Sequence, residues 1–303
     1  MMDQVTRAFY ELHFELAFLK KKADEFQDFF SSVMEKGYPA DFTRVRPWGN
    51  VGDKKNDGYL KSKRTLFQVY GPNDLAAKET IEKIGEDFTG ALPHWKEYFD
   101  TWVFVHNSKA GLGPDVLKKL LDLETANPPI KVTLWGFQEL YDEAFQLDEH
   151  HLASLFGPAP SRQGMVDLGL ADLAPILDHI SGLAPVDDPD IRPVSSEKLN
   201  HNQLSNNVAV LLRAGMGRAD LVKKYFKAQP TKKDQIAETF KGKYTEIREQ
   251  GTPPDEIFAQ LQRFAGGDLL PSPAKQNGVL AVLAHFFEAC DIFESPNAIG
   301  ETA

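Results

Sequence analysis

Apolar residues in the first half of the chain follow two different spacings. Residues 9–36 carry them at helical spacing, and Gly37 ends that run. Short β-rich runs occupy residues 42–48, 57–60, 65–70, 101–107 and 130–136, with helical patterns over 73–92, 114–125 and 137–157. This order of one helix, three strands and then alternating helices and strands predicts an α/β fold. Its sheet is mixed, because an antiparallel hairpin precedes the parallel crossovers.

The second half of the chain has a different pattern. Residues 158–194 are rich in proline and hold one short apolar stretch, which predicts a linker with an embedded helix. From residue 195 onward each apolar stripe has helical spacing and ends at a glycine or a proline. The predicted domains are therefore an α/β domain over 1–157, a linker over 158–194 and a helical domain over 195–303.

Composition narrows the class of protein. The chain has 303 residues and a net charge of −10, with no apolar run near the length of a membrane span and no signal-peptide pattern at its start. Its single cysteine, Cys290, excludes an intrachain disulfide and a cysteine-based metal cluster. We expect a cytoplasmic protein.

The net negative charge is not spread evenly along the chain, because basic residues outnumber acidic ones between residues 36 and 64. Such a local basic surface is compatible with docking of nucleic acid at one place. The candidates for binding the phosphate backbone are Arg44, Arg46, Lys54, Lys55 and Lys61. Two alternatives stay open: a solvated, lysine-rich hairpin, and arginines that pair with nearby carboxylates.

Two oxygen-bearing side chains lie on neighbouring strands of the predicted hairpin. Asp57 starts one strand and Gln68 lies in the middle of the next. Adjacent strands are about 4.8 Å apart, so two such side chains on one sheet edge can share a hard divalent cation. A bound Mg²⁺ or Mn²⁺ would polarise a phosphodiester and lower the pKa of its bound water.

The order of elements and these residues resemble the restriction-endonuclease-like, or PD-(D/E)xK, superfamily of nucleases. The resemblance implies a metal site made by Asp57, Gln68 and an acid on the opening helix, which falls on Glu25 or the neighbouring Gln27. The sequence departs from the motif at Tyr70, where the superfamily has a lysine that stabilises developing charge. Lys78 is the preferred replacement, with Lys54 or Lys55 as alternatives.

Longer strings carry a second resemblance. The segments RVRPWGNVGDKKNDGY, LFQVYGP and WVFVHNSKAGL, with LSNNVAVLLRAGMGRADLVKKYF and PPDEIFAQLQRFAGGD further on, resemble bacterial defence proteins of ABC three-component systems. The resemblance implies partners: double-stranded DNA, and an SMC- or Rad50-like ABC ATPase with a small third subunit docked on the helical domain.

Three functions remain open at this point. The first is a metal-dependent DNA endonuclease subunit of a defence assembly. The second is the same fold with an inactive site, acting as a DNA-binding or scaffold subunit. The third is a structural homodimer held by the helical domain.

Overall fold

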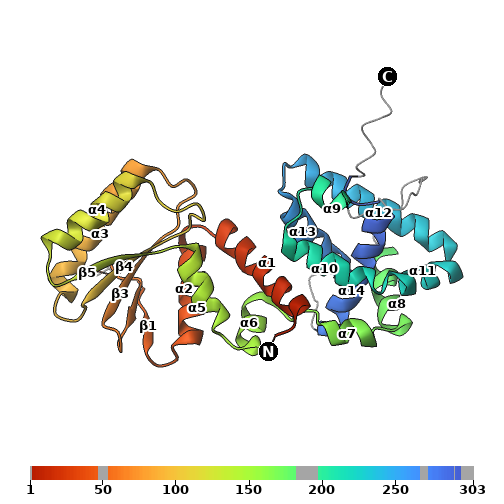
Figure 1. The fold of residues 1–303 in the computed structure, drawn as a ribbon, viewed down its shortest axis with the longest axis horizontal. Helices are drawn as coiled ribbons and strands as arrows, with labels where there is room; N and C mark the ends of the chain where they lie inside the picture. The colour runs from red at the N-terminus through yellow and green to blue at the C-terminus, as the bar shows by residue number, and fades with distance from the viewer. Residues whose placement is uncertain (1, 47–53, 182–196, 267–271, 290, 295–303) are drawn as a thin grey trace, which may run out of the picture. The chain divides into compact units, whose positions relative to one another are not determined.

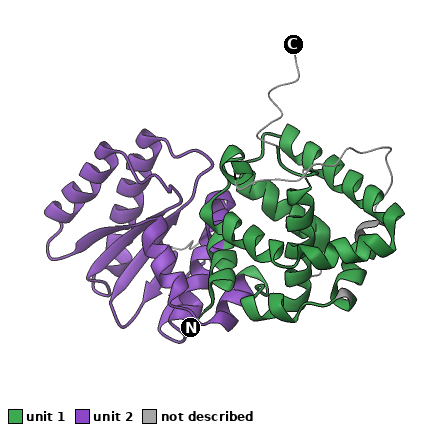
Figure 2. Cartoon of the chain, turned by 45° about the vertical axis from the view of Figure 1, so that its right-hand side comes forward, with its two compact units in different colours: residues 1–13, 156–303 green, residues 14–155 purple. Residues whose placement is uncertain are grey.

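The computed structural model describes residues 2–46, 54–181, 197–266, 272–289 and 291–294. The chain forms two compact units, shown in two colours in Figure 2. The sheet unit comprises residues 14–155, and the helical unit comprises residues 1–13 together with 156–303. The first helix, α1 (Gln4–Lys20), contributes residues to both units.

The sheet unit contains one five-stranded mixed sheet with its strands in sequence order. Strands β1 and β2 and strands β2 and β3 pair antiparallel, whereas β3, β4 and β5 are parallel, as the sequence predicted. The strands are β1 (Phe42–Arg44), β2 (Gly58–Leu60), β3 (Thr65–Tyr70), β4 (Thr101–His106) and β5 (Lys131–Trp135).

Helices cover both faces of the sheet (Figure 1). Helices α3 (Ala77–Trp95) and α4 (Pro114–Ala126) pack on one face, against a core that includes Leu66, Trp102 and Phe104. Helices α2 (Ala23–Gly37) and α5 (Phe137–Phe145) belong to the other face, where the Phe67 ring lies 5.3 Å from the Phe30 ring. Alternation along β3 therefore sends even-numbered side chains toward α3 and odd-numbered ones toward α2.

The opening helical run predicted over 9–36 is two helices rather than one. Helix α1 ends at Lys20 and α2 begins at Ala23, which has a φ of 45°. The Ala23 N–H donates to the carbonyl of Gly71, just beyond β3. The break lets Phe14 and Phe18 of α1 pack against the Phe137 ring, at 5.4 and 5.1 Å.

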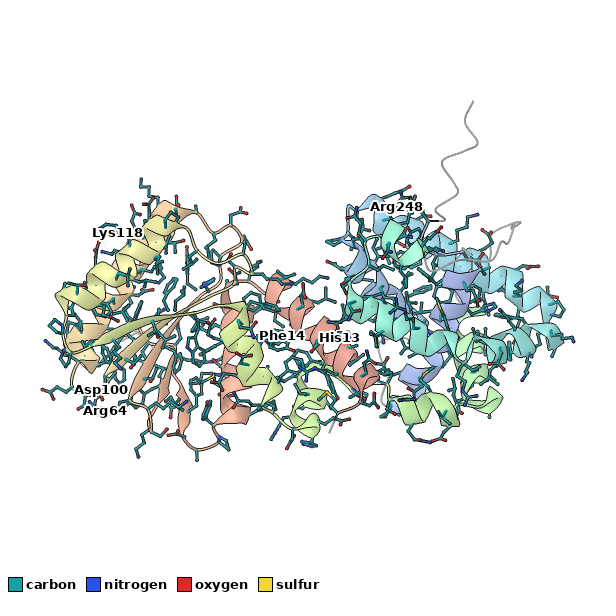
Figure 3. The ribbon with its side chains drawn as sticks, viewed as in Figure 1. His13, Phe14, Arg64, Asp100, Lys118 and Arg248 are labelled. Atoms are coloured by element: carbon teal, nitrogen blue, oxygen red, sulfur yellow. The ribbon has the colours of Figure 1, made fainter. Side chains whose placement is uncertain are left out.

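The amino ends of β3 and β4 are joined by an ion pair. Arg64 Nε donates to Asp100 Oδ2 at 2.9 Å, and the Arg64 carbonyl accepts the Asp100 N–H at 2.9 Å (Figure 3). These contacts set the register in which Thr65 lies beside Thr101. The register places the carboxyl ends of the three parallel strands at one edge of the sheet.

The helical unit is built around α14 (Pro273–Glu288), which is buried along most of its length. It contacts α8 (Leu170–Ser181), α10 (Asn206–Met216), α11 (Ala219–Ala228) and α13 (Pro254–Gly266). The other helices are α6 (Glu149–Phe156), which ends in this unit, α7 (Arg162–Asp167), α9 (Glu197–His201) and α12 (Pro230–Glu249).

The segment predicted as a linker, 158–194, departs from that prediction in its described part. It supplies two helices, α7 and α8, and α8 buries Leu173, Ile176 and Leu177. An apolar stripe of this kind cannot stay in water without cost, so the segment joins the helical core. Residues 182–194 of the predicted linker, and Cys290, lie outside the described residues. No helix among the described residues is long and apolar enough to cross a membrane.

Candidate functional site

The carboxylate of Asp57, the first residue of the expected metal site, accepts hydrogen bonds from other parts of the protein. Asp57 is buried and directly precedes β2. Its Oδ2 accepts the Val69 N–H at 2.7 Å, and its Oδ1 accepts a hydrogen bond from Gln27 Nε2. The carboxylate thus takes the place of a backbone acceptor for Val69 and ties α2 to the hairpin.

The backbone at Asp57 explains the direction of this side chain. Gly58 pairs with Phe67 in the β2–β3 ladder, yet the Asp57 N–H also donates to the Phe67 carbonyl at 2.9 Å. Two residues of one strand therefore oppose a single residue of the other, as in a β-bulge. The bulge breaks the alternation, and the Asp57 carboxylate reaches Gln27 on the α2 side of the sheet.

Of the two residues considered on the opening helix, the structure brings Gln27 to Asp57. Glu25 is exposed in the first turn of α2. Two residues along a helix differ by about 200° in direction, so Glu25 and Gln27 leave the helix on nearly opposite sides. A part for Glu25 in binding a metal stays a prediction.

Gln68 lies on the other face of the sheet. Its neighbours in the alternation, Leu66 and Tyr70, both pack with the core beneath α3 and α4. Gln68 is buried, and its Oε1 has no hydrogen-bond partner among the described residues. The structure therefore joins Asp57 to Gln27 but sends Gln68 away from α2.

Tyr70 stands where the nuclease motif has a lysine, and Lys78 is the residue expected to replace that lysine. The structure gives both an ordinary environment. The Tyr70 ring is 5.9 Å from the Phe104 ring and packs against the apolar core. Lys78 is exposed in the first turn of α3. The role of Lys78 as a replacement cation stays a prediction.

The basic residues expected to bind phosphate are largely matched by carboxylates. Arg44 contacts Asp28 at 2.9 Å and Glu35 at 3.0 Å, and Arg46 contacts Asp28 at 2.5 Å. These acids belong to α2, so a phosphate must compete with them. The sequence alternative in which the arginines pair with nearby carboxylates matches this arrangement.

Lys55 is paired in a similar way with acids of α3. Its Nζ lies 2.6 Å from Glu86 and 3.1 Å from Asp87, and the hydrogen bond to Glu86 helps to raise its pKa. Lys54 and Lys61 are exposed, and the Lys54 carbonyl accepts a hydrogen bond from the Trp95 indole at 3.1 Å. Of the five predicted phosphate contacts, Arg46, Lys54 and Lys61 are exposed, and Arg46 among them is paired with Asp28.

Sequence reasoning missed the buried acid Asp87. Its side chain is fully buried and lies 2.8 Å from Lys83 as well as 3.1 Å from Lys55. The spacing of Lys83 and Asp87, four residues apart on a helix, was the available signal for one of these pairs. The second pair depends on packing of the residue 54–55 segment against α3, which no local pattern reveals.

His106 ends β4 at the carboxyl edge of the parallel strands, where α/β proteins often bind ligands. Its Nδ1 accepts the Ser108 N–H at 3.1 Å, and burial lowers its pKa to about 4. A β-carbon on Gly136 would lie 2.8 Å from its Nε2, so the glycine makes room for the ring. His106 is thus neutral at pH 7 and has a packing role.

A metal ion needs several histidine, cysteine, aspartate or glutamate side chains close together. Among the described residues, one group of three has its possible ligand atoms within 4.8 Å of one another: Asp148, His150 and His151. Helix capping accounts for this closeness. Asp148 Oδ1 accepts the His151 N–H at 2.8 Å at the start of α6 and lies 3.1 Å from His151 Nδ1. No such group in the described part of the chain includes Asp57.

The expected Mg²⁺ site therefore fits poorly. Both Asp57 oxygens accept N–H donors, Glu25 points away from Gln27, and Gln68 lies on the opposite face of the sheet. A hard cation needs several oxygen ligands converging on one point. The unpartnered Gln68 oxygen is the one feature here that favours a ligand.

Comparison with known proteins bears on the helical unit. Residues 171–294 match the model of C-terminal domain 10 of the ABC-three component (ABC-3C) systems. The match begins in α8 and ends just after α14. No curated protein and no solved structure matches the chain.

Proposed function

We propose, from the premise that its C-terminal domain makes this chain a component of an ABC-3C system, that the sheet unit is a nuclease-like module that does not cut DNA. The chain would act in a bacterial defence assembly as a scaffold for other components. ATP hydrolysis would come from an SMC-like ABC ATPase partner. The helical unit would hold the chain in that assembly.

One observation carries this proposal: the Asp57 carboxylate is already used inside the protein. It accepts hydrogen bonds from the Val69 N–H and from Gln27, which belong to a strand and a helix far apart in sequence. A carboxylate that ligates Mg²⁺ must turn its lone pairs toward the ion. Here two of its roughly four lone-pair sites already hold the hairpin and α2 together, so they do not turn toward an ion.

Two further features support the proposal. Tyr70 stands where the nuclease motif has a lysine, and a neutral phenol supplies no positive charge. The order of opening helices, three strands, a helix, a strand, a helix and a strand favours a restriction-endonuclease-like ancestry for the sheet unit.

A plasmid-cleavage assay with Mg²⁺ or Mn²⁺ tests the proposal, using the full chain alone and with the other components of its system. A metal-dependent restriction enzyme serves as positive control. We expect no cutting that depends on this chain. Metal-dependent cutting by the wild type that is lost in both Asp57→Asn and Asp57→Ala would contradict the proposal.

The same two variants also test the structural role of Asp57. Asparagine can accept the Val69 N–H and donate to Gln27 once the Gln27 amide rotates, so we expect little loss of stability. Alanine leaves the buried Val69 N–H without an acceptor, which costs about 1–3 kcal/mol of unfolding free energy. Urea unfolding followed by tryptophan fluorescence measures both, and equal losses would argue against this role.

The second candidate function is a metal-dependent DNA endonuclease, favoured by the buried, unpartnered Oε1 of Gln68. Mg²⁺ or Mn²⁺ would be held by Asp57 and Gln68, with Glu25 or Gln27 assisting. Isothermal titration with Mn²⁺ tests this candidate without an activity readout. Binding to the wild type that disappears in Gln68→Leu would favour it, and the absence of Mn²⁺ binding would remove it.

A further inference from the structure

A hollow of about 750 Å³ lies in the helical unit. Three segments line it: the start of α1, helix α7, and the end of α10 with the turn into α11. We call it the arginine hollow, because three of its lining side chains are Arg162, Arg213 and Arg218. A volume of this size is in the range of sites that hold a small ligand or a short peptide segment.

Arg218 is fixed in place by the protein. Its Nε donates to the Met165 carbonyl, and its Nη2 donates to the Val166 carbonyl. Both acceptors are neutral, so the guanidinium keeps its full positive charge at the wall of the hollow. A charge held in this way needs little reordering when a ligand binds.

Arg162 and Arg213 are exposed, and neither side chain has a hydrogen bond or an ion pair with another described residue. Asp3, the one acid among the described lining residues, accepts hydrogen bonds from backbone donors. Its Oδ1 accepts the N–H groups of Val5 and Thr6, at 2.8 and 3.0 Å, and its Oδ2 accepts the Arg162 N–H at 2.9 Å. The arginine hollow is therefore positively charged on a chain whose net charge is −10.

The rest of the lining is apolar. Val5, Met165, Val210 and Ala214 contribute to it, and Val166 beside them is 57% exposed. An exposed valine next to unpaired arginines is a surface that gains from contact with an apolar group and with carboxylates at the same time. Its chemistry is complementary to an acidic segment that carries an apolar side chain.

The lining fits a peptide carboxylate better than a phosphate group or a nucleic acid. The N–H groups at the start of α1, which would attract a phosphate, are capped by the Asp3 carboxylate. Among the described residues, the lining holds no aromatic side chain on which a base can stack. Arginine clusters with an apolar floor are a known means of recognising acidic peptide motifs.

We propose that the arginine hollow binds an acidic segment with an apolar side chain from another component of the ABC-3C system. This inference rests on the proposed function for the identity of the partner. The matched C-terminal domain supplies Val210, Arg213 and Arg218, while Asp3 and Arg162 come from segments outside it. The hollow thus combines residues of the matched domain with residues outside it.

The test uses the full chain and fluorescein-labelled peptides that tile the sequences of the other components. We expect at least one peptide with several acidic residues beside a leucine, isoleucine or phenylalanine to bind, measured by fluorescence anisotropy. Replacing its acids with lysine should abolish binding, and raising the salt concentration should weaken it. Failure of all acidic peptides to bind, or binding of tripolyphosphate alone, would overturn the proposal.

Charge reversal locates the site. Arg213→Glu and Arg162→Glu should each weaken the binding of that peptide by at least about tenfold. Lys227→Glu is the matched control, because Lys227 is an exposed cation of α11 outside the lining, and it should leave affinity unchanged within about twofold. Circular dichroism checks that each variant is folded.

An Arg213→Glu variant that binds the peptide as tightly as the wild type would overturn the proposal. That outcome is separate from failure of the proposed function, which the plasmid-cleavage assay decides. A chain that cuts DNA can still bind through the arginine hollow. A chain that does not cut can lack this contact.

Discussion

Arg44 lies beside two carboxylates of α2, and a change at this residue separates a structural role from DNA binding. Arg44→Gln removes the ion pairs with Asp28 and Glu35, which should lower the unfolding free energy by about 0.5–1 kcal/mol. Because the guanidinium is already engaged, DNA affinity at low salt should change by less than about twofold. Urea unfolding and anisotropy with labelled duplex DNA measure the two effects.

Lys61→Gln is the matched comparison for Arg44, because Lys61 is an exposed cation of the same hairpin. If the chain binds DNA through this surface, Lys61→Gln should weaken binding more than Arg44→Gln does. A large loss of DNA affinity in Arg44→Gln, with stability unchanged, would restore the interpretation of Arg44 as a phosphate contact.

Asp291, in the helical unit, makes stability depend on pH. Burial raises its pKa to about 6, and its Oδ2 has no hydrogen-bond partner among the described residues. The folded state therefore binds this proton more tightly than the unfolded state does. The resulting cost to stability is present at pH values above about 6 and is relieved as pH falls from about 6 toward 4.

Asp291→Asn should therefore stabilise the helical unit at pH 7.5, by about 1–3 kcal/mol, and should give little gain at pH 4.5. Thermal unfolding followed by circular dichroism at both pH values measures the difference from wild type. A gain of equal size at both pH values would show that burial of the charge is not the cause.

At the scale of elements, close packing between α10 and α14 depends on one glycine. A β-carbon on Gly215 would lie 2.2 Å from the Leu280 carbonyl oxygen, which belongs to the backbone and cannot move aside easily. Gly215→Ala should therefore destabilise the helical unit by about 1–3 kcal/mol. Circular dichroism during thermal unfolding measures the change.

Gly242 provides the opposite case within α12. No atom of the described residues lies within 4 Å of the position that its β-carbon would take, so Gly242→Ala should stabilise the helix by about 0.5–1 kcal/mol. The same substitution thus has opposite signs in two helices of one unit. Destabilisation of equal size in both variants would contradict the packing argument for Gly215.

At the scale of the whole molecule, the first thirteen residues belong to the unit formed by the end of the chain. Thr6 Oγ1 donates to the Pro160 carbonyl at 2.9 Å, and the Tyr10 ring lies 6.4 Å from the Phe156 ring. Phe9 and Tyr10 are both buried. A chain lacking residues 1–13 should therefore lose stability mainly in its helical unit.

Two signals distinguish the units. All four tryptophans lie between residues 48 and 135, so tryptophan fluorescence reports on the sheet unit, whereas circular dichroism reports on the helices of both units. In the shortened chain, the transition seen by circular dichroism should move to lower temperature. The transition seen by tryptophan fluorescence should move less. An equal shift in both signals would show that residues 1–13 support the two units alike.

Much of the fold was accessible from the sequence. The β-rich run at 65–70 became β3 with the same bounds, and the pattern of strands and helices predicted a mixed sheet with parallel crossovers, which the structure has. The helical second half was also accessible, and the ABC-3C context, expected from a resemblance of strings in both halves, is supported by the match over 171–294. The strands and helices follow from local periodicity and composition, which each segment carries by itself, whereas the ABC-3C context came from the resemblance of longer strings.

Tertiary structure alone decided the candidate site. Periodicity placed Asp57 and Gln68 on adjacent strands, but the extra residue opposing Phe67 turned Asp57 toward α2. The partners of Arg44, the joining of Thr6 to Pro160 and the arginine hollow likewise depend on segments far apart in sequence. Hydrogen bonds and ion pairs act over a few ångströms, so packing of distant segments determines which side chains meet.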